Sequence, residues 1–198
     1  EGQQLVVADG VAAVARDAGQ AAWFQILVKE GAAPPRVGFR GTLTSGFEDV
    51  EWFGRGPHES YVDRFASSRV GLFRGLISEQ TFKYVRPQEN GNKFETRWMA
   101  LKRGAGASCG GLLIAAAQPS GKLEMQCHRY SLDDFDGPEI KEKQAIKHGG
   151  ELEERAETDI CVDAAQMGVG GIDSWGNKPL KEHMLSSTEP LAWAFQLR

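Results

Sequence analysis

A glycine-rich loop near the end of the chain combines residue types that suit ligand recognition. Residues 166–176 contain four glycines within nine positions, which lets the backbone adopt positive φ angles or approach a ligand closely. Asp173 and Ser174 can hydrogen-bond their own backbone and so fix the turn that follows Gly170 and Gly171. The pattern predicts a loop that presents the next side chain outside the core.

That next side chain is Trp175, and its chemistry suits a sugar. An indole stacks on the C–H face of a sugar ring while its N–H remains free to donate a hydrogen bond. The other tryptophans lie in strand-like alternation that favours burial: Trp23, Trp52, Trp98 and Trp193. The residues alone leave two alternatives for Trp175, a ligand-facing role and a local packing role.

Motifs for nucleophilic catalysis and for metal binding are not found. The loop 168–171 lacks the lysine and hydroxyl residue of a phosphate-binding loop, and neither Gly-x-Ser-x-Gly nor His-Glu-x-x-His occurs. Residues 133–137 lack the spacing and terminal glutamate of a calcium loop, so we expect a solvated turn there. The four histidines are scattered along the chain: His58, His128, His148 and His183. No nucleophile stands out, and we expect no metal ligand in this chain.

Two polar loops supply further candidates. They hold Arg55, Glu59, Asp63 and Arg64 in the first loop, and Gln88, Glu89, Asn90 and Arg97 in the second. Each set can form an internal charge network that fixes an irregular segment, which is the favoured interpretation. Each can instead line a polar groove or contact another domain.

Composition is that of an ordinary globular chain, because the 198 residues are 41% hydrophobic and 25% charged. A net charge of −4 gives no electrostatic reason to expect nucleic acid or an anionic membrane as partner. The longest apolar run, 112–117, is too short to span a bilayer, and the polar start shows no signal peptide. Cys109, Cys127 and Cys161 are widely spaced, so we expect reduced and mostly buried thiols rather than disulfides or a zinc site.

Apolar residues at alternate positions, separated by turn residues, predict many short strands. The expected strands cover residues 5–8, 11–15, 23–28, 37–43, 50–53, 82–86, 94–101, 112–117, 123–128, 158–162 and 191–197. We expect 112–117 to be buried on both faces, 123–128 to be half exposed, and a turn region near Gly71 and Gly75. At most one short helix is expected, over 138–148. The sequence thus predicts an all-β antiparallel sandwich that forms a single domain over residues 1–198.

Three motifs give the chain a family resemblance. They are residues 54–64 (GRGPHESYVDR), residues 84–92 (YVRPQENGN) with Arg97-Trp98, and residues 166–176 (QMGVGGIDSWG). In this order, and across nearly the whole chain, they resemble the C-terminal domain, or small chain, of the β-galactosidases of glycoside hydrolase family two. The resemblance implies a galactose-mutarotase-like β-supersandwich, and it implies that the chain is most of one domain of a longer polypeptide.

The resemblance also implies that the bond-breaking chemistry lies elsewhere. Retaining hydrolysis of a β-galactoside needs two carboxylates about 5 Å apart. In the family both are glutamates on a (β/α)8 barrel, which also carries the magnesium ligands. We therefore assign no catalytic residue to this chain and expect it to be inactive alone. Magnesium and sodium are implied for the parent enzyme, and no cofactor for this chain.

Trp175 receives a specific role from the resemblance, because the family uses a tryptophan at this position to stack on the substrate from the C-terminal domain. The residues that support this loop are Gly170, Gly171, Asp173 and Ser174. Ile172 departs from the family pattern, which has an aspartate there. The implied partners are the barrel and the other domains, a β-galactoside and further copies in a homo-oligomer, and the implied location is the cytoplasm.

Two alternatives keep the same fold. The chain would act as a non-catalytic carbohydrate-binding or structural module if Trp175 stacked on another sugar or on a neighbouring domain. Aldose 1-epimerase activity would need histidines and a glutamate arranged around a sugar. The three motifs favour the β-galactosidase domain over both.

Overall fold

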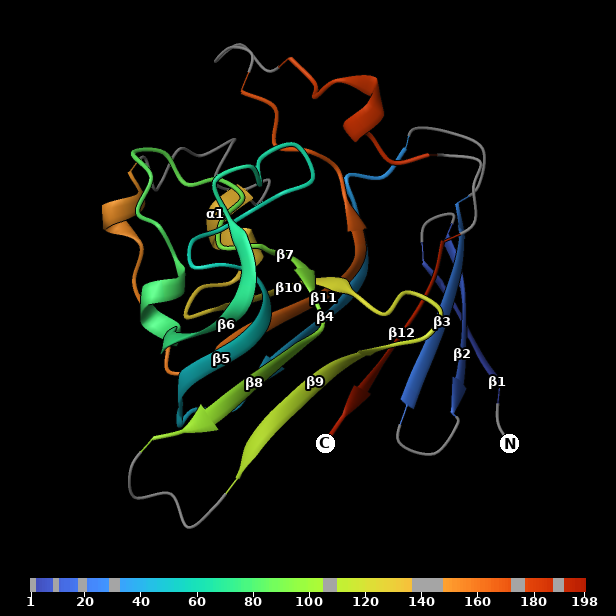
Figure 1. The fold of residues 1–198 in the computed structure, drawn as a ribbon, viewed down its shortest axis with the longest axis horizontal. Coiled ribbons are helices and arrows are strands. Elements are labelled where there is room, and N and C mark those ends of the chain that lie inside the picture. Colours follow the sequence, from blue (N-terminus) through green and yellow to red (C-terminus); the bar gives the residue numbers. More distant parts are fainter. Residues whose placement is uncertain are drawn as a thin grey trace.

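Two antiparallel sheets build the fold (Figure 1). The computed structural model describes residues 3–8, 11–17, 21–28, 33–104, 110–136, 148–171, 177–186 and 191–198. The larger sheet has eight strands, in the spatial order β1 (Gln3–Ala8), β2 (Val11–Asp17), β3 (Ala21–Val28), β12 (Leu191–Leu197), β9 (Gly111–Ala117), β8 (Trp98–Arg103), β5 (Phe47–Gly56) and β6 (Arg69–Leu76). The smaller sheet has four, in the order β4 (Arg36–Leu43), β11 (Thr158–Gln166), β10 (Leu123–His128) and β7 (Lys93–Thr96). The predicted antiparallel all-β fold is confirmed.

The two sheets share one hydrophobic core. Trp52 of β5 and Met99 of β8 contribute to it from the larger sheet, and Met125 of β10 and Val162 of β11 from the smaller one. Because side chains alternate between the two faces of a strand, every second residue of these strands enters this layer. The sheets therefore pack as a sandwich, and Trp193 of β12 is buried in it as the sequence predicts.

The cysteines of the described part of the chain behave as reduced core residues. Cys127 and Cys161 are free and buried, as expected, and burial raises the pKa of each thiol to about 12. Such thiols are inert, because only the thiolate is strongly nucleophilic. Cys109 lies outside the described residues.

Strand β6 occupies the region in which the sequence predicts a turn. Gly71 lies opposite Gly54 of β5, and Gly75 lies opposite Val50. The glycine of β5 is required by packing, since a Cβ at Gly54 would lie 2.6 Å from Oγ1 of Thr96. Gly71 and Gly75, on which the predicted turn rests, thus lie in a strand that pairs with β5, and the predicted turn is wrong.

Residues 82–86 form an irregular segment rather than the predicted strand. The side-chain amide of Asn90 accepts a hydrogen bond from the Phe82 N–H at 2.9 Å and donates one to the Phe82 carbonyl. The carbonyl of Tyr84 accepts from the Gly149 N–H at 3.1 Å. These contacts satisfy the backbone locally, so the segment needs no strand neighbour.

Strand β10 is buried on both faces, although its alternation predicts one exposed face. Its polar residues Glu124, Gln126 and His128 are buried. The second polar loop supplies hydrogen-bond partners for Glu124 and Gln126, and Thr81 supplies one for His128. For strand β9 the prediction is wrong in the other direction. The sequence predicts burial on both faces, but Ile114 is the one fully buried residue of this strand.

The described helices are short. They are the 3₁₀ helices η1 (Ile77–Gln80), η2 (Gly149–Glu151) and η3 (Lys181–His183), and the α-helix α1 (Leu132–Asp136). Helix α1 stands where a solvated turn is predicted, and Ser131 starts it by accepting a hydrogen bond from the Asp133 N–H at 3.1 Å. The helix predicted over 138–148 lies outside the described residues except for its last position.

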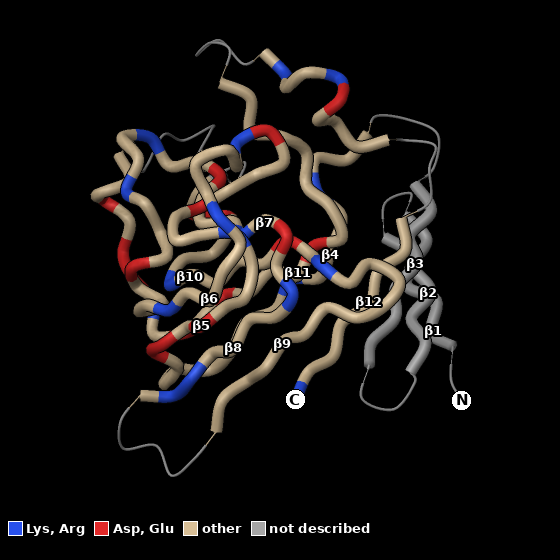
Figure 2. The backbone as a smooth tube through the Cα atoms, viewed as in Figure 1, with Lys and Arg blue, Asp and Glu red and all other residues tan. Residues whose placement is uncertain are grey.

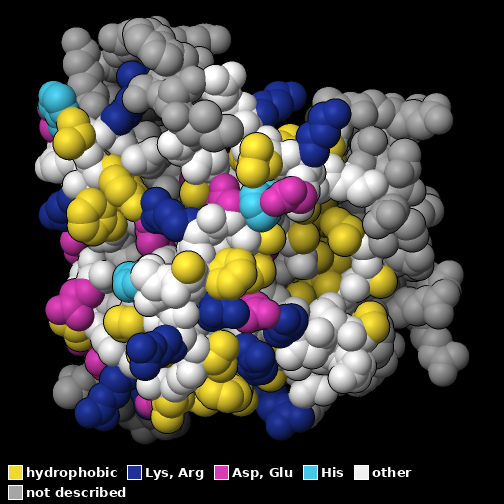
Figure 3. All heavy atoms as spheres, turned by 45° about the horizontal axis from the view of Figure 1, so that its top comes forward, with side chains coloured by type: hydrophobic (Ala, Val, Ile, Leu, Met, Phe, Trp, Pro, Cys, Tyr) yellow, Lys and Arg dark blue, Asp and Glu magenta, His cyan; other side chains and the backbone are white. Residues whose placement is uncertain are grey.

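Charged side chains of both signs are interspersed along the backbone and over the surface (Figures 2 and 3). On the face drawn in Figure 3, described side chains of both signs occur, and basic ones gather in the lower part of the view. No helix in the described ranges is long and apolar enough to cross a membrane.

Candidate functional site

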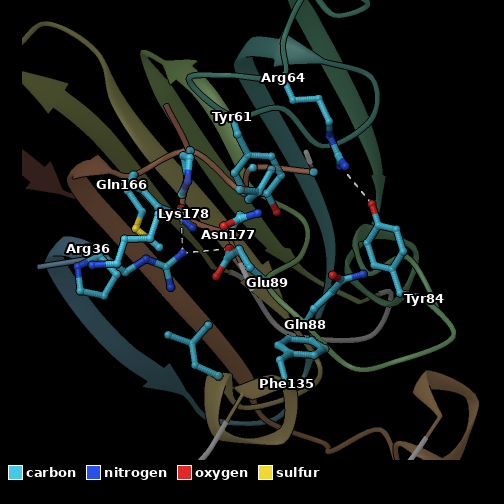
Figure 4. Close-up of a pocket in the computed structure, with 18 of the residues that line it drawn as sticks. Arg36, Tyr61, Arg64, Tyr84, Gln88, Glu89, Phe135, Gln166, Asn177 and Lys178 are labelled. Carbon is cyan, nitrogen blue, oxygen red and sulfur yellow. Dashed lines mark hydrogen bonds and ion pairs between the residues drawn. The ribbon is translucent and has the colours of Figure 1, made fainter. Parts of the chain in front are cut away.

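A cavity of about 690 Å³ lies where the glycine-rich loop meets the smaller sheet (Figure 4). Its walls come from distant parts of the chain: the start of β4, the loop after β5, the segment before β7, helix α1 and the residues after β11. Figure 4 shows the guanidinium of Arg36 directed toward Glu89, with Tyr61 and Phe135 adding aromatic rings to the wall. A cavity of this size accommodates a small ligand such as a monosaccharide.

The glycine-rich loop is held at the cavity by hydrogen bonds to its backbone. The N–H of Gly168 donates to the carbonyl of His183 at 2.8 Å, and the N–H of Gly170 donates to the Asp63 carboxylate at 2.8 Å. Gly170 and Gly171 have φ angles of +74° and +103°, a region that favours glycine. The sequence therefore predicts correctly that this loop needs glycine, but the anchoring residue Asp63 comes from the first polar loop.

The predicted site residues fall into two groups. Gly170 and Gly171 line the cavity. Asn177, Lys178 and Pro179, which follow the loop in sequence, line it as well. Asp173, Ser174 and Trp175, together with Ile172, lie outside the described residues. The described residues on either side of them, Gly171 and Asn177, both line the cavity.

Arg36 is the central polar residue of the cavity, and no motif in the sequence marks it. Its Nη2 donates to Oε1 of Glu89 at 3.0 Å and to Oε1 of Gln166 at 2.9 Å, and its Nε lies 3.0 Å from Oδ2 of Asp163. Burial lowers the pKa of Arg36, but the carboxylates of Asp163 and Glu89 outweigh it, so this pKa lies above its ordinary value. Gly38 is required beside this pair, because a Cβ there would lie 2.0 Å from Oδ1 of Asp163.

A second polar layer lies behind Arg36. Oε1 of Glu124 accepts a hydrogen bond from the Gln166 N–H at 2.9 Å, and its Oε2 accepts one from the side chain of Asn92. Burial raises the pKa of Glu124 to about 7, against these two hydrogen bonds, which favour the charged form. Gln126 donates to Glu89 from the same strand. Layered partners of this kind hold the cavity side chains in one arrangement.

The first polar loop forms the internal charge network that the sequence favours. Glu59 accepts hydrogen bonds from Arg64, from the hydroxyl of Tyr84 and, at 2.8 Å, from the N–H of Gly91. Arg64 and Tyr84 also line the cavity and are 3.0 Å apart, Nη2 to hydroxyl, as Figure 4 shows. The two interpretations of this loop, an internal charge network and the wall of a groove, therefore hold together, because Arg64 belongs to the network and also lines the cavity.

The remaining candidates lie away from the cavity. Arg55 pairs with Glu95 at 2.7 Å, and Arg97 stacks over the ring of Phe53, 5.7 Å from its centroid. None of the described residues that line the cavity is a histidine. His128 lies behind the cavity wall, where burial lowers its pKa to about 3 and its Nδ1 contacts the hydroxyl of Thr81 at 2.8 Å. The histidine arrangement that an epimerase would require is therefore not formed by the described residues.

The cavity suits binding better than proton transfer. Glu89 and Asp163 both pair with Arg36, and Glu124 is held by Gln166 and Asn92, so each of these carboxylates has structural partners. Within the described ranges, no group of three or more His, Cys, Asp and Glu side chains could hold a metal ion. Guanidinium, carboxylate and amide groups beside aromatic rings are the groups that orient hydroxylated ligands.

Comparison with known proteins gives a consistent result. Residues 8–197 match the family described as beta galactosidase small chain. The chain is 33% identical to a β-galactosidase of Priestia megaterium over 164 residues, which cover 83% of this chain and 14% of that protein. It is 34% identical to a β-galactosidase of Vibrio cholerae over 152 residues, which cover 77% of this chain and 13% of that protein. It is 32% identical to a β-galactosidase of Lactococcus lactis over 153 residues, which cover 77% of this chain and 14% of that protein. The chain thus spans about a seventh of the length of the curated relatives it matches.

Proposed function

The chain belongs to the β-galactosidase small-chain family, and we propose on this premise that it is the C-terminal portion of an enzyme that hydrolyses terminal β-D-galactosides such as lactose. The observation that carries the proposal is the match over residues 8–197, because it includes the glycine-rich loop and both polar loops. In this proposal the chain helps to bind the substrate and supports the site, and it breaks no bond itself.

Trp175 is the proposed substrate-binding residue, stacking its indole on a sugar ring. Two observations support this role: Gly171 and Asn177 both line the cavity, and Asp63 fixes the backbone just before the segment. The proposed supporting residues are Gly170, Gly171, Asp173 and Ser174. This chain has Ile172 where the family pattern has an aspartate, so its loop carries one carboxylate fewer.

The catalytic glutamates are proposed to lie on a barrel domain outside this chain. This is supported by the carboxylates in and behind the cavity wall. Glu89 and Asp163 pair with Arg36, and Glu124 accepts a hydrogen bond from the Gln166 N–H. Magnesium and sodium are assigned to the other domains of the parent enzyme on the family resemblance alone. The barrel and the remaining domains are the proposed partners, within a homo-oligomer in the cytoplasm.

The test is a tryptophan substitution in the full-length parent. We expect Trp175→Ala to raise KM for lactose about tenfold, equivalent to about 1.4 kcal/mol of lost stacking. Trp98→Phe, a change at a partly buried tryptophan of β8, is the control and should leave KM unchanged. The purified 198-residue chain should not hydrolyse a β-galactoside. An unchanged KM in Trp175→Ala, or turnover by the chain alone that a mutation within it abolishes, would contradict the proposal.

A second function, an autonomous carbohydrate-binding module, is favoured by one observation. The cavity around Arg36 combines charged and amide groups with the rings of Tyr61 and Phe135, so it has the composition of a sugar site without any other domain. Tryptophan fluorescence of the isolated chain, titrated with galactosides, separates the two functions. Saturable quenching that is lost in Trp175→Ala would support the module, and no response would support the role within the parent enzyme.

A further inference from the structure

Lys93 of β7 is a buried amine, and no described residue pairs a carboxylate with it. Its side chain lies between the sheets and the residue is only 3% exposed. Its Nζ lies 4.8 Å from the centroid of the Trp52 ring. Among the residues that the structure describes, none places a carboxylate oxygen within 4.0 Å of this Nζ. The indole face stabilises the ammonium but does not neutralise its charge.

This amine forms part of the wall of a second cavity, of about 540 Å³. The Lys93 cavity is defined by Lys93, Trp52, Phe82, Tyr84, Arg64 and Arg74. Arg64 and Tyr84 line this cavity and also the cavity beside the glycine-rich loop. Their hydrogen-bonded pair therefore lies between the two cavities. The Lys93 cavity is therefore a separate space from the proposed substrate site.

Among the described residues that line the Lys93 cavity, the charges leave one cation uncompensated. Glu59 lines the cavity, but it pairs with Arg64, and its oxygens also accept from Tyr84 and Gly91. Arg74 and Glu79 line it as well and offset each other in charge. The surplus is the single positive charge of Lys93. Burial lowers the pKa of this amine to about 8, and the negative charge of Glu59, which raises it, only partly opposes this effect.

We propose that the Lys93 cavity binds a small organic monocarboxylate, with its carboxylate on the Lys93 ammonium and its apolar part against Trp52 and Phe82. One surplus positive charge matches a monoanion better than a phosphate dianion. The aromatic walls suit the hydrophobic body of an organic acid, because a small, strongly hydrated inorganic ion would gain nothing from them. A neutral ligand would leave the buried charge unpaired, which is unfavourable in a medium of low dielectric constant.

The experiment is calorimetric titration of the full-length parent polypeptide with benzoate, with benzamide as the uncharged ligand of the same shape and inorganic phosphate as the inorganic anion. We expect benzoate to bind and benzamide and phosphate to bind at least tenfold more weakly. Lys93→Met, which keeps the side-chain length and removes the charge, should weaken benzoate binding at least tenfold, whereas Lys93→Arg should retain most of it.

A second measurement reports on Lys93 directly. Reductive methylation with formaldehyde and borohydride, followed by peptide mapping, should modify Lys93 severalfold more slowly in the presence of benzoate than of benzamide. Hydrolysis of a β-galactoside by Lys93→Met should match the wild type and verify its fold. The proposal is overturned if benzoate fails to bind, if it binds wild type and Lys93→Met equally, or if phosphate binds as tightly as benzoate.

Discussion

The carboxylate of Asp63 accepts a hydrogen bond of 2.8 Å from the backbone N–H of Gly170, although the two residues lie 107 positions apart in the chain. Its other oxygen accepts from the N–H of Val169 at 3.1 Å. Hydrogen bonds from backbone N–H groups to an ionised carboxylate are stronger than those between neutral groups. Asp63 therefore ties the first polar loop to the glycine-rich loop, immediately before the segment that carries Trp175.

Replacing Asp63 by asparagine should weaken substrate binding in the parent enzyme. Asparagine keeps one acceptor oxygen, but its NH₂ group then faces a backbone N–H, so one of the two hydrogen bonds is lost. A charge-assisted hydrogen bond is worth about 1.5–3 kcal/mol, and only part of this free energy reaches substrate binding, because the bond orders the loop rather than contacting the substrate. We therefore expect roughly a fivefold rise in KM, equivalent to about 1 kcal/mol, with a smaller change in kcat. Steady-state kinetics with lactose measure this. Asp49→Asn, at an exposed carboxylate of β5, is the control, and an equal effect of both variants would contradict the role of Asp63.

Gly168→Ala should destabilise the same contact by steric pressure. A Cβ at Gly168 would lie 2.4 Å from Oδ2 of Asp63, so either the carboxylate or the loop must shift. Overpacking of this kind typically costs about 1–3 kcal/mol. Gly150→Ala is a matched control, because a Cβ at Gly150 would meet nothing within 4 Å. Urea unfolding of the two variants should show a loss for Gly168→Ala only, and equal midpoints would contradict the geometry.

The sandwich could be predicted from the sequence because strand alternation is a local signal. Leu191 to Leu197 alternates in the sequence and forms β12 as expected. Burial was harder to predict, as β10 illustrates. Glu124 and Gln126 look solvent-facing by alternation, yet distant residues, Asn92 and Glu89, cover them and satisfy their hydrogen bonds. Local alternation contains no information about a loop that folds back over a strand.

The candidate site could be predicted from the sequence only where the residue type alone, or a short separation between two residues, indicates the structure. The positive φ angles of Gly170 and Gly171 follow from glycine content, and the Glu59–Arg64 pair lies within six residues of sequence. Arg36 gave no such signal, because its partners Glu89 and Asp163 are distant in sequence and a lone arginine at a strand start is common. Only the pairing of β4 with β11 reveals it as the centre of the cavity.

Removing Arg36 should be among the costly single substitutions in this fold. Arg36→Met leaves the Asp163 carboxylate, whose side chain is 2% exposed, without its guanidinium partner. Breaking a buried ion pair costs up to about 3–5 kcal/mol. Burial raises the pKa of Asp163 to about 8 even beside Arg36, so this carboxyl takes up a proton in the variant and the loss lies toward the lower end of that range. Lys102→Met removes an ion pair with Glu51 whose lysine is largely exposed, and it should cost less than about 1 kcal/mol. Chemical denaturation compares them, and similar losses in both variants would show that the buried pair contributes little.

Glu124 should make stability depend on pH. Burial raises the pKa of this carboxyl to about 7 in the folded protein, above its ordinary value of 4.5. The folded state therefore holds the proton more tightly than the unfolded state. The stabilising contribution is complete below about pH 4.5, decreases by up to about 1.4 kcal/mol per pH unit as the pH rises, and is lost once the pH passes about 7. Glu124→Gln should make this slope shallower without removing it, because burial also raises the pKa of Asp163, to about 8, and its proton gives a slope of the same sign. Glu48→Gln, at an exposed residue of β5, should keep the wild-type slope. Urea unfolding between pH 5 and 8 measures the slopes, and an unaltered slope in Glu124→Gln would assign the titration to another group.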